Sequence, residues 1–221
     1  MSSSWTQVRR LPARRVSVSL KIMVAVAALS LMSFWPLAKA VADRVPPADT
    51  DAQTPTPVND IFNALSRCPV PLSETERWRL AGAIHHESSE HGYDPLFVMA
   101  LIQVESGCSR TAVSGRGGVG LVQIKPSTAR AVAKDAGVPW KGPEILTRPA
   151  MNLKLALLYL AQLEEQFGDP YLAMVAFNKG PARVGRMSPQ RAQGARYVKK
   201  VLALYEDLTD EAAADAADDP L

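Results

Sequence analysis

Helix start and stop signals alternate along the sequence, and this alternation limits the possible folds most strongly. Asp94-Pro95 places a capping aspartate before a proline, the favoured order at a helix N-terminus, and Gly107 stops the apolar run that follows. Runs of β-branched residues are scarce beside alanine and leucine, and aromatic residues make up only 6% of the chain. The sequence therefore predicts an all-α fold rather than a β-sandwich.

Similar signals elsewhere divide the chain into six expected helices. A glycine-rich loop is expected over residues 108–120, and a long connection over residues 138–149. Since a domain contains about 150 residues on average, we expect one compact domain over residues 60–208 of the 221. The expected helices span residues 73–91, 95–106, 126–136, 150–167, 170–178 and 188–208.

The segments on either side of this domain have different compositions. Residues 1–42 hold six basic residues and no acidic one, and the uncharged stretch 22–38 precedes the small-x-small site Ala38-Lys39-Ala40. This pattern predicts an export signal, and an uncleaved membrane anchor is the alternative. Either way, we expect the domain in the periplasm. Residues 43–59 are a predicted proline-rich linker, and residues 209–221 a disordered acidic tail.

The charge of the domain suggests the class of partner. Residues 60–205 contain 18 basic and 12 acidic residues, a net charge of +6. A mildly basic surface suits an anionic polymer, but this charge is too dilute to indicate nucleic acid. We expect no nucleic-acid partner.

The only two cysteines are Cys68 and Cys108. In an oxidising compartment this even number predicts a disulfide, which would close a loop worth about 3–4 kcal/mol of stability. Two separate buried thiols are the alternative.

Two sequence patterns suggest cofactor sites but lack the required context. His86, Glu87, Glu90 and His91 do not have the spacing of a zinc protease, and pairs four residues apart fit an exposed, paired helix face. Residues 115–120 fit G-x-G-x-x-G, but a predicted helix precedes them where a dinucleotide site needs a strand. We therefore expect no metal and no cofactor.

Glu105 is the strongest candidate for an acid catalyst. It ends an apolar helix at a spacing that places it with Val98 and Ile102, which should face the core. Such a position raises the pKa of a carboxyl group, as a general acid at neutral pH requires. A helix-end glutamate that reaches solvent is the alternative. No acidic residue follows until Asp135, so the adjoining loop supplies no partner for a two-carboxylate glycosidase.

Five short blocks, in this order, resemble the catalytic domain of soluble lytic transglycosylases over about residues 73–206. The resemblance implies a goose-type lysozyme-like fold and a lyase that acts on peptidoglycan glycan strands. The blocks are Glu105-Ser106-Gly107, Ala112-Val113-Ser114, Gly120-Leu121-Val122-Gln123-Ile124 before Pro126, Ala176-Phe177-Asn178-Lys179-Gly180, and Tyr197-Val198.

The resemblance also implies residue roles. Glu105 would protonate the bond between N-acetylmuramic acid and N-acetylglucosamine, and then deprotonate the muramic C6 hydroxyl, which attacks C1 and forms a 1,6-anhydro end. Tyr197 would orient Glu105. The implied substrate contacts are Ser114, Gln123, Phe177 and Asn178.

Some positions depart from the family pattern, and other functions stay open. Val122, Lys125, Phe177 and Lys179 stand where the family usually has other residues, which affects the expected rate and subsite preference. One alternative is a muramidase of the same fold that uses water. Another is a catalytically weak glycan-binding scaffold. We expect the protein to be a monomer. Its linker and tail could dock it to cell-envelope machinery.

Overall fold

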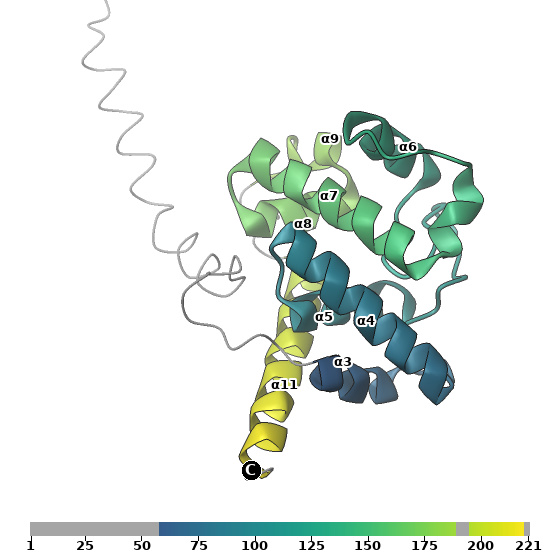
Figure 1. The fold of residues 1–221 in the computed structure, drawn as a ribbon. Coiled ribbons are helices and arrows are strands. Elements are labelled where there is room, and N and C mark those ends of the chain that lie inside the picture. The colour runs from purple at the N-terminus through teal and green to yellow at the C-terminus, as the bar shows by residue number, and fades with distance from the viewer. Residues whose placement is uncertain (1–57, 189–194, 219–221) are drawn as a thin grey trace, which may run out of the picture. The chain divides into compact units, whose positions relative to one another are not determined.

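The computed structural model describes residues 58–188 and 195–218, which are mainly helical as predicted (Figure 1). The predicted export signal or anchor and nearly all of the predicted linker lie outside the described residues. No helix in the described part of the chain is long and apolar enough to cross a membrane. The elements are α3 (Val58–Ala64), η1 (Leu65–Arg67), α4 (Glu74–His91), α5 (Pro95–Ser106), α6 (Pro126–Asp135), η2 (Pro143–Thr147), α7 (Pro149–Phe167), α8 (Pro170–Lys179), α9 (Pro181–Val184) and α11 (Arg196–Asp218).

Helix α5 is the centre of the core. All its residues from Leu96 to Ile102 are buried, because α3, α4 and α11 pack around it. The predicted start and stop signals operate as expected: Asp94 caps the helix, and Gly107 ends it in the left-handed conformation with φ of 58°. Because the core encloses this apolar helix on all sides, its last turn is held rigidly in place.

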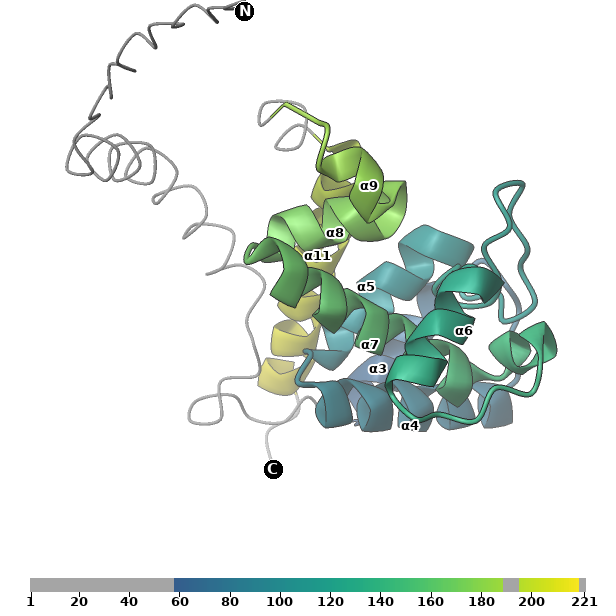
Figure 2. The ribbon, with the colours of Figure 1, turned by 90° about the horizontal axis from the view of Figure 1, so that it is seen from above.

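Helices α7 and α8 form the second part of the domain. Helix α8 packs on α7, and α6 packs on α7 toward its other end (Figure 2). A capping box starts α4, since Ser73 and Glu76 bond to each other's backbone N–H groups. The helix expected over residues 150–167 begins one residue earlier, at Pro149.

Helix α11 corrects the prediction for the acidic tail. It continues through Asp218, where the sequence analysis predicted an end near Leu208 followed by disorder. Alanine, the best helix former, is frequent in this segment, and two contacts tie it to the start of the domain. Arg67 pairs with Glu211 at 2.8 Å, and Asn63 donates to Asp215 at 3.4 Å. The sequence analysis expected this helix from Ser188-Pro189; Ser188 is not helical, residues 189–194 lie outside the described residues, and α11 begins at Arg196.

The sequence analysis missed some local structure on the surface. It did not predict α3, η1, η2 or α9, which are short and lack strong capping signals. Near α3, the Trp78 side chain of α4 is 42% exposed and stacks on Phe62 with ring centroids 4.1 Å apart. Arg77 covers the Phe62 ring at 4.4 Å, so these three side chains form a small cluster at the surface.

Candidate active site

Helix α5 places Glu105 at its exposed end. Glu105 lies in the last turn and is half-buried, because the preceding turns are enclosed by the core. Gly107 follows in a conformation that favours glycine, and an added Cβ there would lie 3.0 Å from Pro69 Cγ. The chain therefore turns sharply after Glu105 and leaves the carboxyl group at the end of a rigid helix.

Glu105 and Tyr197 form an interacting pair. Burial raises the pKa of Glu105 above its ordinary value of 4.5, and the Tyr197 hydroxyl partly offsets this by stabilising the carboxylate. Burial raises the pKa of Tyr197 well above 10, and the neighbouring Glu105 raises it further. Tyr197 thus keeps its proton and can act only as a donor to an ionised Glu105.

The contact between these two groups is loose in the structure. The Tyr197 hydroxyl oxygen is buried, yet no acceptor or donor among the described residues meets both the distance and the angle of a hydrogen bond with it. Catalytic hydrogen bonds are often long or poorly aligned before substrate binds. A buried hydroxyl without a partner is costly, so closing this contact on Glu105 is favourable.

Glu105 stands apart from other acids. Among the described residues, the influences that shift its pKa are burial and Tyr197, with no second carboxylate. A site with two catalytic carboxylates within about 5–10 Å would couple their charges. The arrangement therefore suits chemistry in which one carboxyl group first donates and then accepts a proton.

The loop between α5 and α6, which extends beyond the predicted residues 108–120, holds Ser114 and Gln123 in a hydrogen-bonded turn. The Ser114 hydroxyl accepts the N–H of Gly118 at 2.9 Å. Gln123 has a positive φ of 52°, and its amide nitrogen donates to the carbonyls of Ala112 at 3.1 Å and Gly120 at 2.8 Å. Isolated antiparallel bridges join Val119 to Val113 and to Ile124. The loop is thus ordered by its own side chains, and in the described residues the Gln123 side-chain oxygen accepts no hydrogen bond.

Asn152 in α7 anchors the loop, and the sequence analysis did not single it out. Its side chain is fully buried, accepts the N–H of Val122 at 2.9 Å, and donates to the carbonyls of Val119 at 2.9 Å and Leu146 at 3.0 Å. Gly120 lies directly on it, since an added Cβ would overlap the Asn152 amide. The sequence signal that could have identified Asn152 is its position as a single asparagine on an otherwise apolar helix face.

Helix α8 carries Phe177 and Asn178 in its last turn. The Phe177 ring packs on Tyr159 of α7, with centroids 5.6 Å apart, so it is held from one side. Asn178 is half-buried, and its side chain makes no hydrogen bond to another described residue. Its amide therefore remains available to a ligand.

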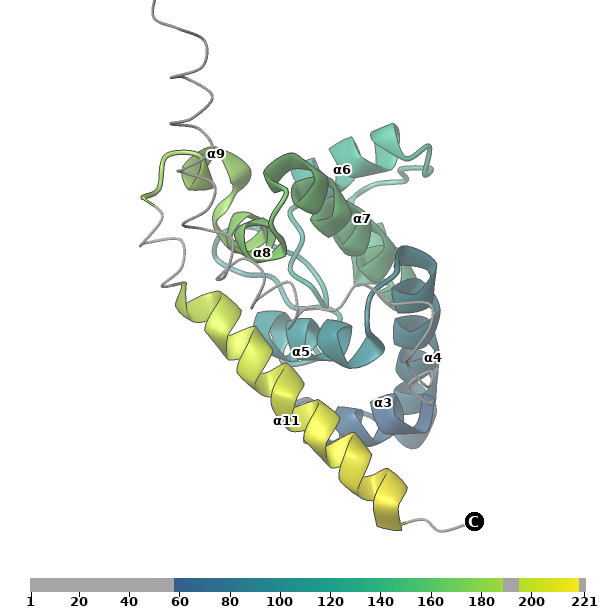
Figure 3. The same ribbon diagram turned by 90° about the vertical axis from the view of Figure 1, so that its left-hand side faces the viewer.

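The site residues come from four parts of the fold, which are α5, the loop after it, α8 and α11. Helix α11 packs on both α5 and α8 (Figure 3), and Tyr197 in its first turn interacts with Glu105 of α5. Ser114 and Gln123 come from the loop after α5 and meet each other through Gly118. Among the described side chains, neither Ser114 nor Gln123 forms a hydrogen bond with Glu105.

The four departures from the family pattern have different environments. Val122 is buried, and Phe177 is half-buried against Tyr159. Lys125 and Lys179 are exposed, at the start of α6 and the end of α8. The first two therefore change packing, whereas the lysines add positive charge to the surface.

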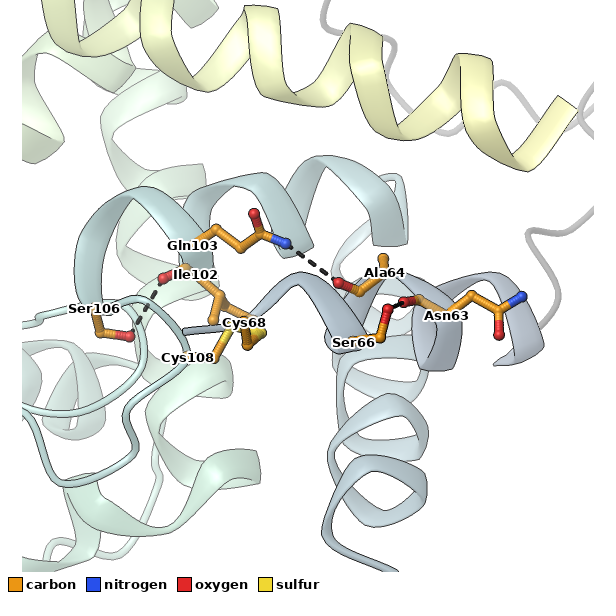
Figure 4. Close-up of a disulfide and its surroundings, with 8 residues drawn as sticks. All are labelled: Asn63, Ala64, Ser66, Cys68, Ile102, Gln103, Ser106 and Cys108. Carbon is orange, nitrogen blue, oxygen red and sulfur yellow. Dashed lines mark hydrogen bonds between the residues drawn. A yellow bond between two sulfur atoms is a disulfide. The ribbon is translucent and has the colours of Figure 1, made fainter. Parts of the chain in front are cut away.

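The predicted disulfide is present and supports the end of α5. Cys68 and Cys108 are bonded with Cα atoms 5.8 Å apart, which joins the segment before α4 to the loop after Glu105 (Figure 4). Nearby, Gln103 donates from α5 to the carbonyl of Ala64 at 3.4 Å. The disulfide and this hydrogen bond join the end of α5, which carries Glu105, to α3 and the segment that follows it.

The histidine cluster of α4 differs from the expected exposed face. Glu87 is only 6% exposed, and the Nε2 atom of His91 lies 3.7 Å from its carboxylate. Burial lowers the pKa of His91, and Glu87 partly offsets this. No group of three or more potential metal ligands occurs among the described residues.

Comparison with protein families gives one match that covers these elements. The sequence model of the transglycosylase SLT domain family matches residues 82–199, from α4 to the first turn of α11. This range includes Glu105, Ser114, Gln123, Asn178 and Tyr197.

Curated relatives share part of this range. The chain is 34% identical over 138 residues to the endo-type membrane-bound lytic murein transglycosylase A of Klebsiella pneumoniae, covering 57% of this chain and 66% of that protein. It is 36% identical over 90 residues to the soluble lytic murein transglycosylase of Salmonella typhimurium, covering 40% of this chain and 14% of that protein. The match thus spans less than two thirds of either relative.

Two solved structures have a similar fold. The 70 kDa soluble lytic transglycosylase of Escherichia coli aligns with a TM-score of 0.52 and 22% identity, covering 69% of this chain and 30% of that one. An inactive mutant of a lytic transglycosylase from Pseudomonas aeruginosa aligns with a TM-score of 0.50 and 24% identity, covering 67% and 28%. These likenesses bear on the fold, which agrees with the predicted lysozyme-like helical domain.

Proposed function

Because the chain belongs to the transglycosylase SLT domain family, we propose that it is a peptidoglycan lytic transglycosylase. It would cleave the β-1,4 bond from N-acetylmuramic acid to N-acetylglucosamine without water. The observation that carries this proposal is the half-buried Glu105, which is paired with a tyrosine and has no second carboxylate among the influences on its pKa in the described residues. One carboxyl group suffices when the substrate supplies the nucleophile.

The proposed reaction uses Glu105 twice. The protonated carboxyl group donates its proton to the glycosidic oxygen, and the C1–O bond breaks as the N-acetylglucosamine leaves with a new hydroxyl. The resulting carboxylate then takes the proton of the muramic C6 hydroxyl, whose oxygen bonds to C1. The product is a 1,6-anhydro end, and Glu105 regains its proton, so no water is consumed.

Other residues would support these two steps. The Tyr197 hydroxyl would donate to Glu105 while it is ionised, which holds the carboxylate in position between the steps. Asn178 has an uncommitted amide, and Gln123 an uncommitted side-chain oxygen, so both could bind sugar hydroxyl or acetamido groups. We propose the same binding role for Ser114 and a packing role for Phe177 against the sugar.

The digestion of purified sacculi, followed by mass spectrometry, tests this function. A lytic transglycosylase releases ends lighter by one water than the reducing ends left by a muramidase. Glu105→Gln should abolish release, because general acid–base catalysis contributes about 10²–10⁴-fold and the amide has no proton to transfer. Glu164→Gln is a matched control, since Glu164 also has a raised pKa and a tyrosine partner, Tyr93, at 3.1 Å.

Each outcome of this experiment has a clear meaning. Anhydro ends that depend on Glu105 support the proposal. Reducing ends would instead identify a muramidase. Binding to sacculi with no cleavage by the wild-type protein would identify a scaffold module. Activity of Glu105→Gln above about a tenth of wild type would place the acid elsewhere.

We also propose that the domain works outside the cytoplasm. The support is the Cys68–Cys108 disulfide, which is stable in oxidising compartments, together with the export-type N-terminal sequence. Expression of the full chain, cell fractionation and the intact mass of the mature protein would test this. An N-terminus after Ala40 would indicate a cleaved signal, and a full-length chain in the membrane fraction an anchor.

A further inference from the structure

Helix α11 carries its basic and acidic residues in the opposite order to the one that stabilises a helix. Arg196, Lys199 and Lys200 lie in its first turns, where no acidic residue occurs, and no basic residue occurs in its last turn. The N-terminal end of a helix bears partial positive charge and favours anions. Arg196 is also three positions from Lys199 and four from Lys200, so it lies beside both on the helix surface and the like charges repel. Local helix stability therefore does not account for their placement.

Two segments that carry proposed site residues share this excess of positive charge. Residues 170–205, which include α8 and the start of α11, contain seven basic residues and no acidic one. Residues 106–134, which follow Glu105 in the chain, contain five basic residues and no acidic one. Both segments carry proposed substrate contacts, so the charge excess coincides with the site rather than with the whole surface.

The basic side chains near α8 and α11 are available to a ligand. We call six of them the basic rim; they are exposed, and none forms an ion pair within the described residues. Helix α8 packs on both α9 and α11, which brings the elements that carry them together (Figure 3). The members are Lys179, Arg183, Arg186, Arg196, Lys199 and Lys200.

The basic rim does not act on the proposed acid itself. A cation close to Glu105 would favour its ionised form, yet no member of the rim is among the influences that shift its pKa. The rim can therefore attract an anionic ligand while Glu105 stays protonated. The positive charges of the rim therefore suit contacts with parts of the substrate away from the bond that is cleaved.

We propose that the basic rim binds carboxylate groups that a peptidoglycan strand carries along its length, and so selects anionic glycan over neutral glycan. The inference rests on the proposed function and names the chemical feature of the substrate. Carboxylates occur on the stem peptides and, where a stem has been removed, on the exposed lactyl group of muramic acid. Neutral polymers of N-acetylglucosamine have neither.

Binding is measured with three glycans and two sets of charge reversals. The glycans are stem-bearing strands, strands stripped by an amidase, and chitin oligosaccharides. The first variant is Arg196→Glu/Lys199→Glu/Lys200→Glu, and the second is Lys179→Glu/Arg183→Glu, which leaves the residues of α11 unchanged. Arg79→Glu is the matched control, because Arg79 is exposed on α4, away from α8 and α11.

We expect each variant to raise KM for stem-bearing strands about tenfold, because each lost exposed charge contact lowers affinity about two- to fivefold. The kcat and the pH profile should be unchanged. Wild-type binding should weaken as salt rises from about 0.05 to 0.5 M, and variant binding should respond less. The α11 variant should melt at the same or a higher temperature, because acids suit a helix start.

The possible results separate this inference from the proposed function. Preference for stem-bearing over stripped strands assigns the stem carboxylates, and equal binding of both, above chitin, assigns the lactyl carboxylates. A KM within twofold of wild type in both variants, or equal binding of chitin, overturns the inference while Glu105-dependent anhydro ends still support the function. Absence of such ends in the wild type overturns the function instead.

Discussion

The side chain of Asn152 in α7 accepts the backbone N–H of Val122 at 2.9 Å, and this bond fixes the loop that carries Gln123. Two further bonds from the Asn152 amide hold the carbonyls of Val119 and Leu146. Val119 and Val122 lie in the irregular loop and Leu146 in the short 3-10 helix η2, and such segments have few other ways to satisfy their hydrogen bonds when buried. One buried amide therefore gives the loop its shape.

We predict that Asn152→Leu lowers the free energy of unfolding by about 3–5 kcal/mol and strongly reduces cleavage. The substitution leaves the two buried backbone groups of Val122 and Leu146 and the half-buried carbonyl of Val119 without partners, each buried one at about 1–3 kcal/mol. Urea unfolding followed by circular dichroism measures the loss, and kcat/KM on sacculi measures activity. Asn59→Leu, at an exposed position in α3, is the control. A loss below about 1 kcal/mol would show that the loop holds its shape without Asn152.

Tyr197→Phe should lower kcat by about 10–10³-fold with little change in KM. The phenyl ring keeps its packing, but Glu105 loses the donor that holds it while ionised, a loss of about 1.4–4 kcal/mol in the transition state. Tyr93→Phe is the matched control, because it removes the tyrosine partner of a different carboxylate, Glu164. A kcat of Tyr197→Phe within twofold of wild type would remove Tyr197 from the catalytic group.

The rate of cleavage should fall as pH rises through the pKa of Glu105. The free enzyme needs the protonated acid, and burial raises that pKa above 4.5, so activity extends further toward neutral pH than an ordinary carboxyl group allows. The profile of kcat/KM against pH tests this. A profile that rises over the same range would show that Glu105 acts first as a base.

The same shift predicts a pH-dependent difference in stability between wild type and Glu105→Gln. Because the folded protein holds the Glu105 proton more tightly than the unfolded chain, its stabilising contribution is complete below pH 4.5. It is lost as pH rises through the folded-state pKa. The wild type should therefore lose stability relative to Glu105→Gln over that range, which urea unfolding at several pH values measures. A constant difference would mean that folding leaves the pKa unchanged.

Removal of the disulfide should destabilise the domain by about 2–4 kcal/mol, since the bond closes a loop between residues 40 apart. Cys68→Ser/Cys108→Ser tests this by thermal and urea unfolding in the absence of reductant. Cleavage should also decline, because the bond joins the turn after Glu105 to the segment before α4. Reductant should destabilise the wild type and leave the variant unaffected, and the contrary result would assign the effect to packing.

The course of the main helices was predictable because their determinants are local. Ser73, Asp94 and Gly107 act within one turn of their own positions, so a short stretch of sequence contains the whole cause. The position of Glu105 followed from the same local pattern, which buries one side of α5 and ends it at glycine. The Cys68–Cys108 pairing followed from there being only two cysteines.

Other features depend on which elements meet, and only the tertiary structure decides them. The tail beyond Leu208 is helical and contacts Asn63 and Arg67, which lie more than 140 residues away. Likewise, Asn152 orders a loop that is about 30 residues distant in sequence. The charge and periodicity of a segment do not identify its partner, because long-range contacts are formed between separate stretches of chain. The Glu105–Tyr197 pair belongs to this class, since it exists only where α11 crosses the end of α5.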